Sequence, residues 1–356
     1  MRSYHNQQVV NKREKVRELL MELPPFVREY VQGINDSKEQ GTILEYVRDI
    51  KTFLTFLVSV NPSYEGTKLR DIPFSVLEQL APEDIDEYMA YLTYYKVNGH
   101  EYRNGRTTKA RKLSSLSGMY KFFIKRKKLV NNPIDAVERP NINRKNIARL
   151  DSKESKRLIE DVESGNSLSR KQADFHGKTK YRDKAILITF LYTGLRLSEL
   201  VGLNHSDVLF GNDASSFKVI RKGGDEDTVY FGDEVKKALK DYIEFERQAL
   251  LSRSKEDVPE SESALFVSLQ RRRISLRAVQ VLVKKYSEQS KDIHKNISPH
   301  KCRSTFGTAL YEETGDLYLV AEILGHKSVD TTRRHYAMMG DDRKKLASRI
   351  NIYENS

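Results

Sequence analysis

The feature that most limits how this chain can fold is a break in its apolar pattern at residues 140–150. The stretch ERPNINRKNIARLDSKES is rich in Asn, Arg and Lys and has no repeating apolar positions. A chain of 356 residues is also too long for one ordinary hydrophobic core. We therefore predict two domains joined by a basic linker at residues 140–150. Ser152 is the candidate N-cap of the next helix.

The part of the chain before this linker has helical periodicity. Apolar side chains recur at helical spacing over residues 43–57 and 85–92. The stretch TTKARKLSSLSGMYKFFIKRKKL has one apolar face, while its other faces have Lys and Arg. We predict an all-α domain at residues 36–139, preceded by a basic N-terminal extension at residues 1–35.

Positive charge is concentrated at the end of this helical half. From Arg106 to Arg149 there are thirteen basic residues and two acidic ones, in a chain with a formal net charge of +12. Such a run is often only a solvated face, and charge alone does not separate DNA from RNA or an acidic membrane surface. The local excess favours a nucleic-acid surface. Its candidate DNA-binding residues are Lys109, Arg111, Lys112, Lys121, Lys125, Arg144 and Lys145.

Several classes of protein are disfavoured by composition. No apolar run approaches the roughly 18 residues that a membrane helix needs, and the N-terminus has no signal-peptide core, so we expect a cytoplasmic protein without a membrane partner. The single cysteine, Cys302, rules out an intrachain disulfide and a Cys-rich zinc site. The sequence has no HExxH motif, Walker-type loop or carboxylate cluster. We expect no metal and no cofactor.

The second half of the chain has a mixed pattern. Helices are predicted near residues 152–163, 180–192, 233–251 and 275–289. SSFKVIRKGGDEDTVYF has two β-rich runs around a glycine-containing turn, which indicates a β-hairpin with Lys222 beside the turn. We predict a mainly α, mixed α/β domain at residues 151–340 with a small antiparallel sheet. Residues 341–356 would form a polar tail.

Four short motifs in this half contain residues suited to chemistry on an anion. In TGLRLSEL, Gly194 ends one helix and Arg196 lies at the junction with the next. In SPHKCRSTF, Ser298 and Pro299 begin a helix whose first turn contains His300 and Arg303. Taken singly, both motifs have ordinary explanations: a solvated arginine, a partner for Glu199, or a capping histidine.

The other two motifs follow closely in the chain. In EILGHKS, Gly325 is typical of a residue that ends a helix, and His326 lies in the turn behind it. In DTTRRHY, Asp330 or Thr331 is a candidate cap for a short helix with Tyr336 in its second turn. A tyrosine is usually a packing residue, and a phenol with a pKa of about 10 is a poor nucleophile at neutral pH.

The order of these residues is more specific than any one motif. Along the chain it runs from Arg196 to Lys222 on a hairpin, then to the pair His300 and Arg303, then to Gly-His and finally to Tyr. This order resembles that of the tyrosine recombinase (phage integrase, Xer-like) family, and the resemblance covers about residues 40–340. The resemblance implies an N-terminal helical core-binding (SAM-like) domain and a C-terminal catalytic domain that form a C-shaped clamp around DNA. It also implies a homotetramer on two DNA sites, with or without a related recombinase as partner, and a C-terminal tail that docks onto a neighbouring subunit.

The resemblance further implies a role for each matching residue. Arg196 and Arg303 would bind the scissile phosphate, His300 would act as base and Lys222 as acid. His326 would donate a hydrogen bond to the phosphate, and Tyr336 would be the nucleophile. The interval from His326 to Tyr336 is one residue longer than in the commonest version of the pattern, so the helical phase of Tyr336 is the point to test.

These residues predict a site-specific recombinase that cuts and rejoins DNA through a 3′-phosphotyrosyl bond. Chromosome-dimer resolution and integration or excision of a mobile element share one active site, so the residues do not choose between them. Two other functions stay open. One is a topoisomerase with the same tyrosine chemistry, and the other is a DNA-binding accessory protein that does not cleave.

Overall fold

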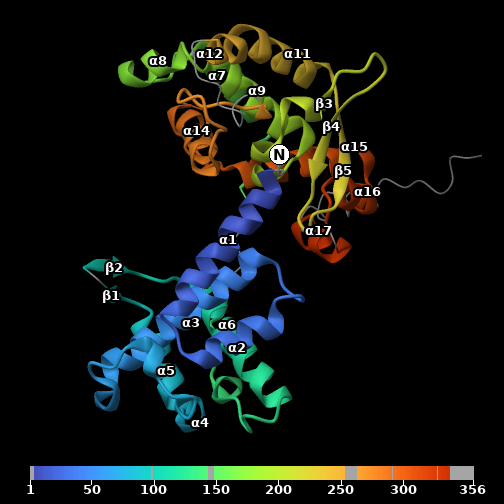
Figure 1. Ribbon diagram of the computed structural model, residues 1–356. Coiled ribbons are helices and arrows are strands. Elements are labelled where there is room, and N and C mark those ends of the chain that lie inside the picture. The colour runs from blue at the N-terminus through green and yellow to red at the C-terminus, as the bar shows by residue number, and fades with distance from the viewer. Residues whose placement is uncertain are drawn as a thin grey trace, which may run out of the picture. The chain divides into compact units, whose positions relative to one another are not determined.

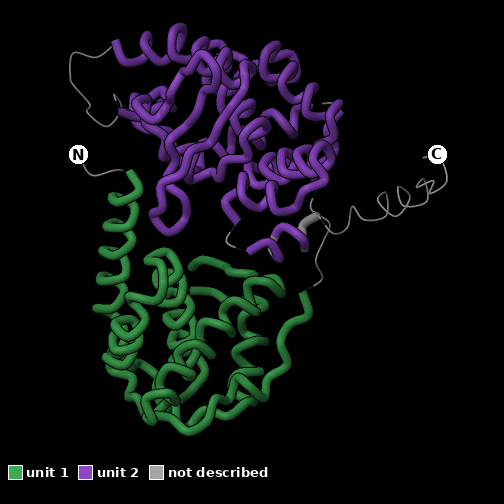
Figure 2. Tube along the Cα trace, turned by 90° about the vertical axis from the view of Figure 1, so that its right-hand side faces the viewer, with its two compact units in different colours: residues 1–145 green, residues 146–356 purple. Residues whose placement is uncertain are grey.

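The computed structural model describes residues 4–97, 99–142, 148–252, 263–290, 292–326 and 328–336. The chain divides into two compact units, residues 1–145 and residues 146–356, which are coloured separately in Figure 2. In the part of the chain that the structure describes, no helix is long and apolar enough to cross a membrane.

Unit 1 is a helical domain with one small hairpin (Figure 1). The helices predicted from periodicity are confirmed. Residues 4–34, which the sequence sets apart as an extension, form two helices, and the first of them packs along α3. Its elements are α1 (Tyr4–Met21), α2 (Pro25–Ile34), α3 (Gln40–Val60), α4 (Val76–Gln79), α5 (Pro82–Tyr91), β1 (Tyr95–Val97), β2 (His100–Tyr102) and α6 (Arg106–Lys125), with antiparallel β1 and β2.

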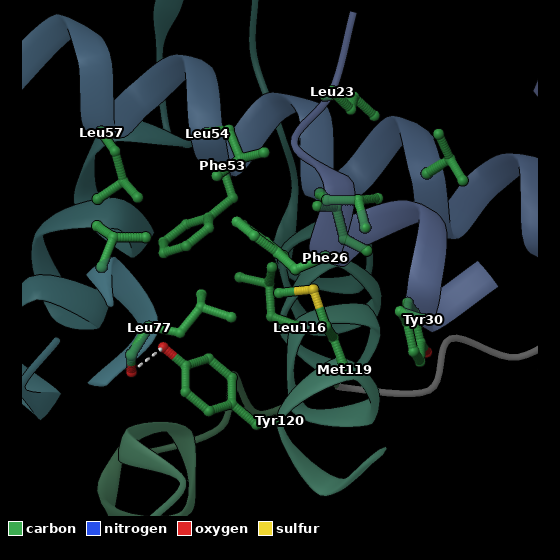
Figure 3. Packing of buried hydrophobic residues seen from close by; sticks show 14 of the residues in the cluster. Leu23, Phe26, Tyr30, Phe53, Leu54, Leu57, Leu77, Leu116, Met119 and Tyr120 are labelled. Carbon is green, nitrogen blue, oxygen red and sulfur yellow. Dashed lines mark hydrogen bonds between the residues drawn. The ribbon is translucent and has the colours of Figure 1, made fainter. Parts of the chain in front are cut away.

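The core of unit 1 is formed by aromatic and aliphatic side chains from α1 to α6 (Figure 3). The Tyr120 hydroxyl donates to the carbonyl of Leu77 at 3.1 Å, so this buried phenol has a partner. Burial raises the pKa of Tyr120 well above its ordinary value. The phenol is therefore a neutral packing group with one satisfied polar atom.

Unit 2 contains helices and a three-stranded antiparallel sheet (Figure 1). α9 is its central helix, and α7, α11 and α15 pack against it. The sheet order is β3-β4-β5, and β4 with β5 forms the predicted hairpin. The elements are α7 (Ser152–Ser164), α8 (Arg170–His176), α9 (Lys180–Thr193), α10 (Leu197–Gly202), β3 (Val208–Leu209), β4 (Ser215–Ile220), β5 (Glu226–Phe231), α11 (Asp233–Tyr242), the π-helical turn η5 (Ile243–Arg247), α12 (Gln248–Leu251), α14 (Leu276–Gln289), α15 (Pro299–Thr314), α16 (Leu317–Ile323) and α17 (Val329–Tyr336).

The predicted helix ranges of unit 2 are confirmed, but two predicted caps are wrong. Asp151 caps α7: its carboxylate accepts the N–H of Glu154 at 2.8 Å, and the Glu154 carboxylate accepts the N–H of Asp151 at 2.8 Å. This reciprocal pair makes Ser152 the first helical residue instead of the cap. α17 begins at Val329, where the Ser328 hydroxyl accepts the N–H of Asp330 at 3.2 Å, ahead of both residues predicted to cap it.

Candidate active site

The turn that ends α16 is the centre of the candidate site. Gly325 has φ +58°, in the left-handed region that glycine tolerates, as predicted. The N–H of Gly325 donates to the Glu322 carbonyl at 2.8 Å, and the N–H of His326 donates to the Ala321 carbonyl at 2.9 Å. This pair of bonds is a Schellman motif. The three carbonyls that follow Glu322 can therefore accept hydrogen bonds from elsewhere in the unit.

Each of those three carbonyls accepts a hydrogen bond from a different arginine. The Ile323 carbonyl accepts from Arg221 Nη2 at 3.1 Å. The Leu324 carbonyl accepts from Arg303 Nη2, and the Gly325 carbonyl accepts from Arg196 Nη2 at 2.7 Å. The end of a helix has partial negative charge, so three guanidinium groups are electrostatically favoured there. Arg196, Arg303 and the turn before His326 thus come together in unit 2.

Arg196 is positioned by the helix junction on which it lies. Gly194 ends α9 with φ +60°, and an added Cβ there would lie 2.5 Å from the ring of Phe306, so the junction needs glycine. Arg196 is the N-cap residue of α10, and its N–H donates to Glu199 Oε2 at 2.8 Å. Its Nη1 donates to Glu199 Oε1 at 2.7 Å. The predicted alternative, a partner for Glu199, is therefore also true of this arginine.

Arg303 is buried near the start of α15, which begins at Pro299 as the Ser298 and Pro299 pattern predicted. Its Nη1 donates to the Gly194 carbonyl at 2.6 Å, so one guanidinium group bridges the end of α9 and the end of α16. A buried arginine with carbonyl partners keeps its charge and has a fixed orientation. His300 lies one turn earlier on α15 and is exposed.

Lys222 lies in the turn of the β4–β5 hairpin, as predicted, and its side chain is exposed. The turn is closed by the N–H of Arg221, which donates to the Asp225 carbonyl at 2.7 Å. Gly223 and Gly224 follow with φ +115° and +99°. The glycines of RKGG thus allow a tight turn that presents Lys222 at its tip.

His326 is linked to α17 by a buried hydroxyl. Nδ1 of His326 lies 2.7 Å from Oγ1 of Thr332, and Thr332 is fully buried. α17 packs against α16 and ends at Tyr336. Positions 332 and 336 are one helical turn apart and so share a face of α17.

The predicted DNA-binding residues of α6 differ in their surroundings. Lys121 and Lys125 are exposed. Lys109 Nζ donates to the Thr93 hydroxyl at 2.5 Å, and Arg111 is exposed but pairs with Asp49 at 2.5 Å. Lys112 is buried, with its ammonium 3.1 Å from the Asp49 carboxylate, and so holds α6 to α3. Arg144 and Lys145 lie outside the described residues.

Cys302, next to Arg303, is fully buried, and burial raises the pKa of its thiol to about 12. The thiol is therefore a small packing group and not a nucleophile at neutral pH. Within the described ranges, no group of three or more His, Cys, Asp or Glu side chains is arranged to hold a metal ion.

Two residues of this site were not singled out from the sequence. Arg221 is in the RKGG motif, directly before Lys222, and Thr332 is in DTTRRHY. The sequence did offer one indication of Arg221, because it directly precedes Lys222, the candidate acid. No sequence signal indicated that Thr332 contacts His326, because that contact depends on how α17 packs.

Residues 148–342 match the phage integrase family. The chain belongs to this family, and the resemblance to tyrosine recombinases is confirmed.

The chain is similar to several named recombinases. It is 29% identical over 323 residues to the tyrosine recombinase XerC of Caldanaerobacter subterraneus subsp. tengcongensis, covering 88% of this chain and 83% of that protein. It is 29% identical over 362 residues to the tyrosine recombinase XerS of Lactococcus lactis subsp. cremoris, covering 95% and 98%. The fold is similar to that of the XerH site-specific recombinase bound to its difH substrate, with a TM-score of 0.59 and 19% identity over 93% of this chain and 95% of that one.

Proposed function

We infer that this protein is a site-specific DNA recombinase that breaks and rejoins DNA strands through a covalent bond to tyrosine. Membership of the phage integrase family and the likeness to Xer recombinases support this function. The observation that carries the residue assignment is the convergence of Arg196 and Arg303 on the turn before His326. The two arginines proposed to bind the phosphate thus donate to the carbonyls of Gly325 and Leu324, directly before His326, the third proposed phosphate-binding residue.

We propose that Arg196, Arg303 and His326 bind the nonbridging oxygens of the scissile phosphate. Negative charge builds on these oxygens in the transition state, and preorganised cations stabilise it. Tyr336 Oη attacks phosphorus and forms the P–O bond to tyrosine, while the P–O5′ bond breaks. His300 takes the phenol proton, and Lys222 gives a proton to the departing O5′. The 3′-phosphotyrosyl bond conserves the energy of the cut linkage, so rejoining needs no nucleotide triphosphate.

The contact between His326 and Thr332 lies within the interval from His326 to Tyr336, which is one residue longer than in the commonest family pattern. Thr332 is held at His326, and position 336 lies one turn further on the same helix face. The proposed attack requires that Tyr336, the last residue of α17, reach this phosphate in spite of the extra residue.

The protein acts on double-stranded DNA as a homotetramer on two sites. Exposed Lys121 and Lys125 on α6, with Arg144 and Lys145 in the linker, contribute phosphate contacts that do not depend on base sequence. Native electrophoresis of the protein on its DNA site tests the assembly. Deletion of residues 345–356 is expected to weaken the tetramer, and an unchanged tetramer would contradict docking by the tail.

A suicide substrate tests the cleavage function. The target is first recovered from genomic DNA by selecting bound fragments, and a nick beside the cleavage position then lets the short 5′-hydroxyl fragment diffuse away. Wild type is expected to accumulate a covalent protein–DNA adduct in denaturing electrophoresis. Tyr336→Phe is expected to form none, while Tyr318→Phe, which changes an exposed tyrosine of α16, keeps full adduct formation.

The same assay separates the alternatives. An adduct with Tyr336→Phe would disprove the assigned nucleophile. Wild type that binds its site without forming an adduct would favour the DNA-binding accessory protein. Relaxation of supercoiled plasmids that lack the site would favour a topoisomerase.

A further inference from the structure

Arg221 is a buried guanidinium that links three parts of the candidate site. It directly precedes Lys222, and its backbone closes the hairpin turn through the 2.7 Å bond from its N–H to the Asp225 carbonyl. Its side chain is only 10% exposed. The roles proposed above give it no contact with DNA, so its burial beside the turn needs another explanation.

The side chain of Arg221 reaches three different elements. Nε donates to Asp227 Oδ2 on β5 at 2.8 Å, and Nη2 donates to the Ile323 carbonyl at the end of α16 at 3.1 Å. Nη1 donates to Glu199 Oε2 on α10 at 3.1 Å. Only the planar, five-donor guanidinium can satisfy three acceptors in these directions at once.

The Glu199 carboxylate links Arg221 to Arg196, one of the two arginines proposed to bind the phosphate. Oε1 of Glu199 accepts from Arg196 and Oε2 accepts from Arg221, and the carboxylate is buried. Gly325 lies against the same group: an added Cβ at Gly325 would be 3.0 Å from Arg221 Nε. The guanidinium of Arg221 thus packs against the turn that leads to His326.

From these contacts we propose that Arg221 is a positioning residue that holds the Lys222 turn in a fixed place relative to the His326 turn. The inference rests on the proposed function, because it assigns Arg221 to the placement of the acid. An exposed hairpin turn with two adjacent glycines has many conformations. Anchoring its first residue to Glu199, Asp227 and Ile323 limits where the next side chain can reach, and a proton donor displaced by about 1 Å can lose about 100-fold in rate.

Arg221→Lys tests this proposal, since it keeps the charge and removes the fork of donors. The cleavage rate is measured on the ordinary phosphodiester and on a substrate with a 5′-bridging phosphorothiolate. In the second substrate the P–S bond breaks, and the thiolate, whose conjugate acid has a pKa of about 8.5, leaves without a proton. Cleavage of that substrate does not need the acid.

We expect Arg221→Lys to cleave the ordinary substrate about 10- to 100-fold more slowly than wild type and the phosphorothiolate within about 3-fold of wild type. Lys222→Ala is expected to show the same rescue. The double variant Arg221→Lys/Lys222→Ala should be no slower than Lys222→Ala alone on the ordinary substrate. Arg277→Lys, the same exchange at an exposed position of α14, should change neither rate.

Equal slowing on both substrates would overturn the proposal, because a folding or phosphate-binding defect is not repaired by a better leaving group. Additive losses in the double variant would overturn it as well. If Arg221→Lys does not fold, Asp227→Asn removes one partner of the guanidinium and is expected to show the same rescue with a smaller loss. Failure of Lys222→Ala to be rescued would instead disprove the assigned acid, and this inference with it.

Discussion

Nδ1 of His326 and Oγ1 of Thr332 are 2.7 Å apart, and this bond ties the turn after α16 to the helix that ends at Tyr336. Thr332→Val keeps the shape of the side chain and removes the hydroxyl. Cleavage is expected to slow about 10-fold, which corresponds to one hydrogen bond of about 1.4 kcal/mol, with DNA affinity unchanged. Suicide-substrate cleavage and gel shift measure the two quantities. Thr332→Ser should retain the wild-type rate, and equal loss in both variants would disprove a role for the hydroxyl.

Glu199 is expected to be important for stability as well as for cleavage. Its buried carboxylate neutralises Arg196 and Arg221, so Glu199→Ala leaves buried positive charge without its partner. We expect the free energy of unfolding to fall by about 3 kcal/mol. Thermal unfolding checks this, with Glu234→Gln on the exposed face of α11 as the control. A midpoint unchanged from wild type would contradict it.

Asp49 should be the electrostatic anchor between α3 and α6. Asp49 is buried and accepts from Arg111, Lys112 and Ser115. Asp49→Ala leaves the buried Lys112 ammonium without its carboxylate partner, so we expect the free energy of unfolding to fall by about 3 kcal/mol. The double variant Asp49→Ala/Lys112→Met should recover part of that loss in urea unfolding, since it removes the buried charge too. A double variant less stable than Asp49→Ala would show that the charge is not the cause.

Lys121 and Lys125 are expected to contribute phosphate contacts. The logarithm of affinity falls as the logarithm of salt concentration rises, by about 0.9 for each phosphate that is neutralised. If each lysine neutralises one phosphate, replacing both by glutamine should make this slope less steep by about 1.8. Gel shifts from low to moderate salt give this slope. Lys68→Gln, another exposed lysine of unit 1, should leave it unchanged. The same slope in the double variant and wild type would show that these lysines do not contact DNA.

His176 should make stability depend on pH. Burial lowers its pKa, with a further contribution from the nearby Lys285 and Lys180 and an opposing one from Asp183. Its Nδ1 is 3.0 Å from the Tyr286 hydroxyl, which donates to Asp183 at 2.9 Å.

Below the unfolded histidine pKa of about 6.5, the unfolded chain binds more protons at this residue than the folded chain does. The free energy of unfolding therefore falls as the pH drops through that value. Urea midpoints at pH 7.5 and 5.5 should differ less in His176→Gln than in wild type. His205, whose pKa burial also lowers, keeps its own contribution in both proteins. Equal differences in the two proteins would exclude His176 as the cause.

Local patterns predicted much of this structure because they depend on near neighbours. Helical periodicity located α3 and α9, the paired glycines located the β4–β5 turn, and Gly325 marked the end of α16. Contacts between distant segments were not predictable in this way. Lys112 looks like any basic residue of a charged stretch until α3 brings Asp49 against it from 63 positions away.

The candidate site shows the same difference between features set by near neighbours and contacts between distant segments. The residue types and their order indicated which side chains take part. The Schellman turn that gathers Arg196 and Arg303, and the burial of Arg221 behind it, depend on the packing of α10, β4, α15 and α16. Such convergence is a property of tertiary structure, and no single stretch of sequence contains it.

The three carbonyls at the end of α16 have a consequence for the thermodynamics of DNA binding. A free arginine side chain has about 2 kcal/mol of rotamer entropy, which it loses when it is held in one orientation. Here the carbonyls of Leu324 and Gly325 order Arg303 and Arg196 during folding. A phosphate that meets these guanidinium groups therefore binds side chains whose conformational entropy is already lost, and more of the contact energy is left to favour the complex.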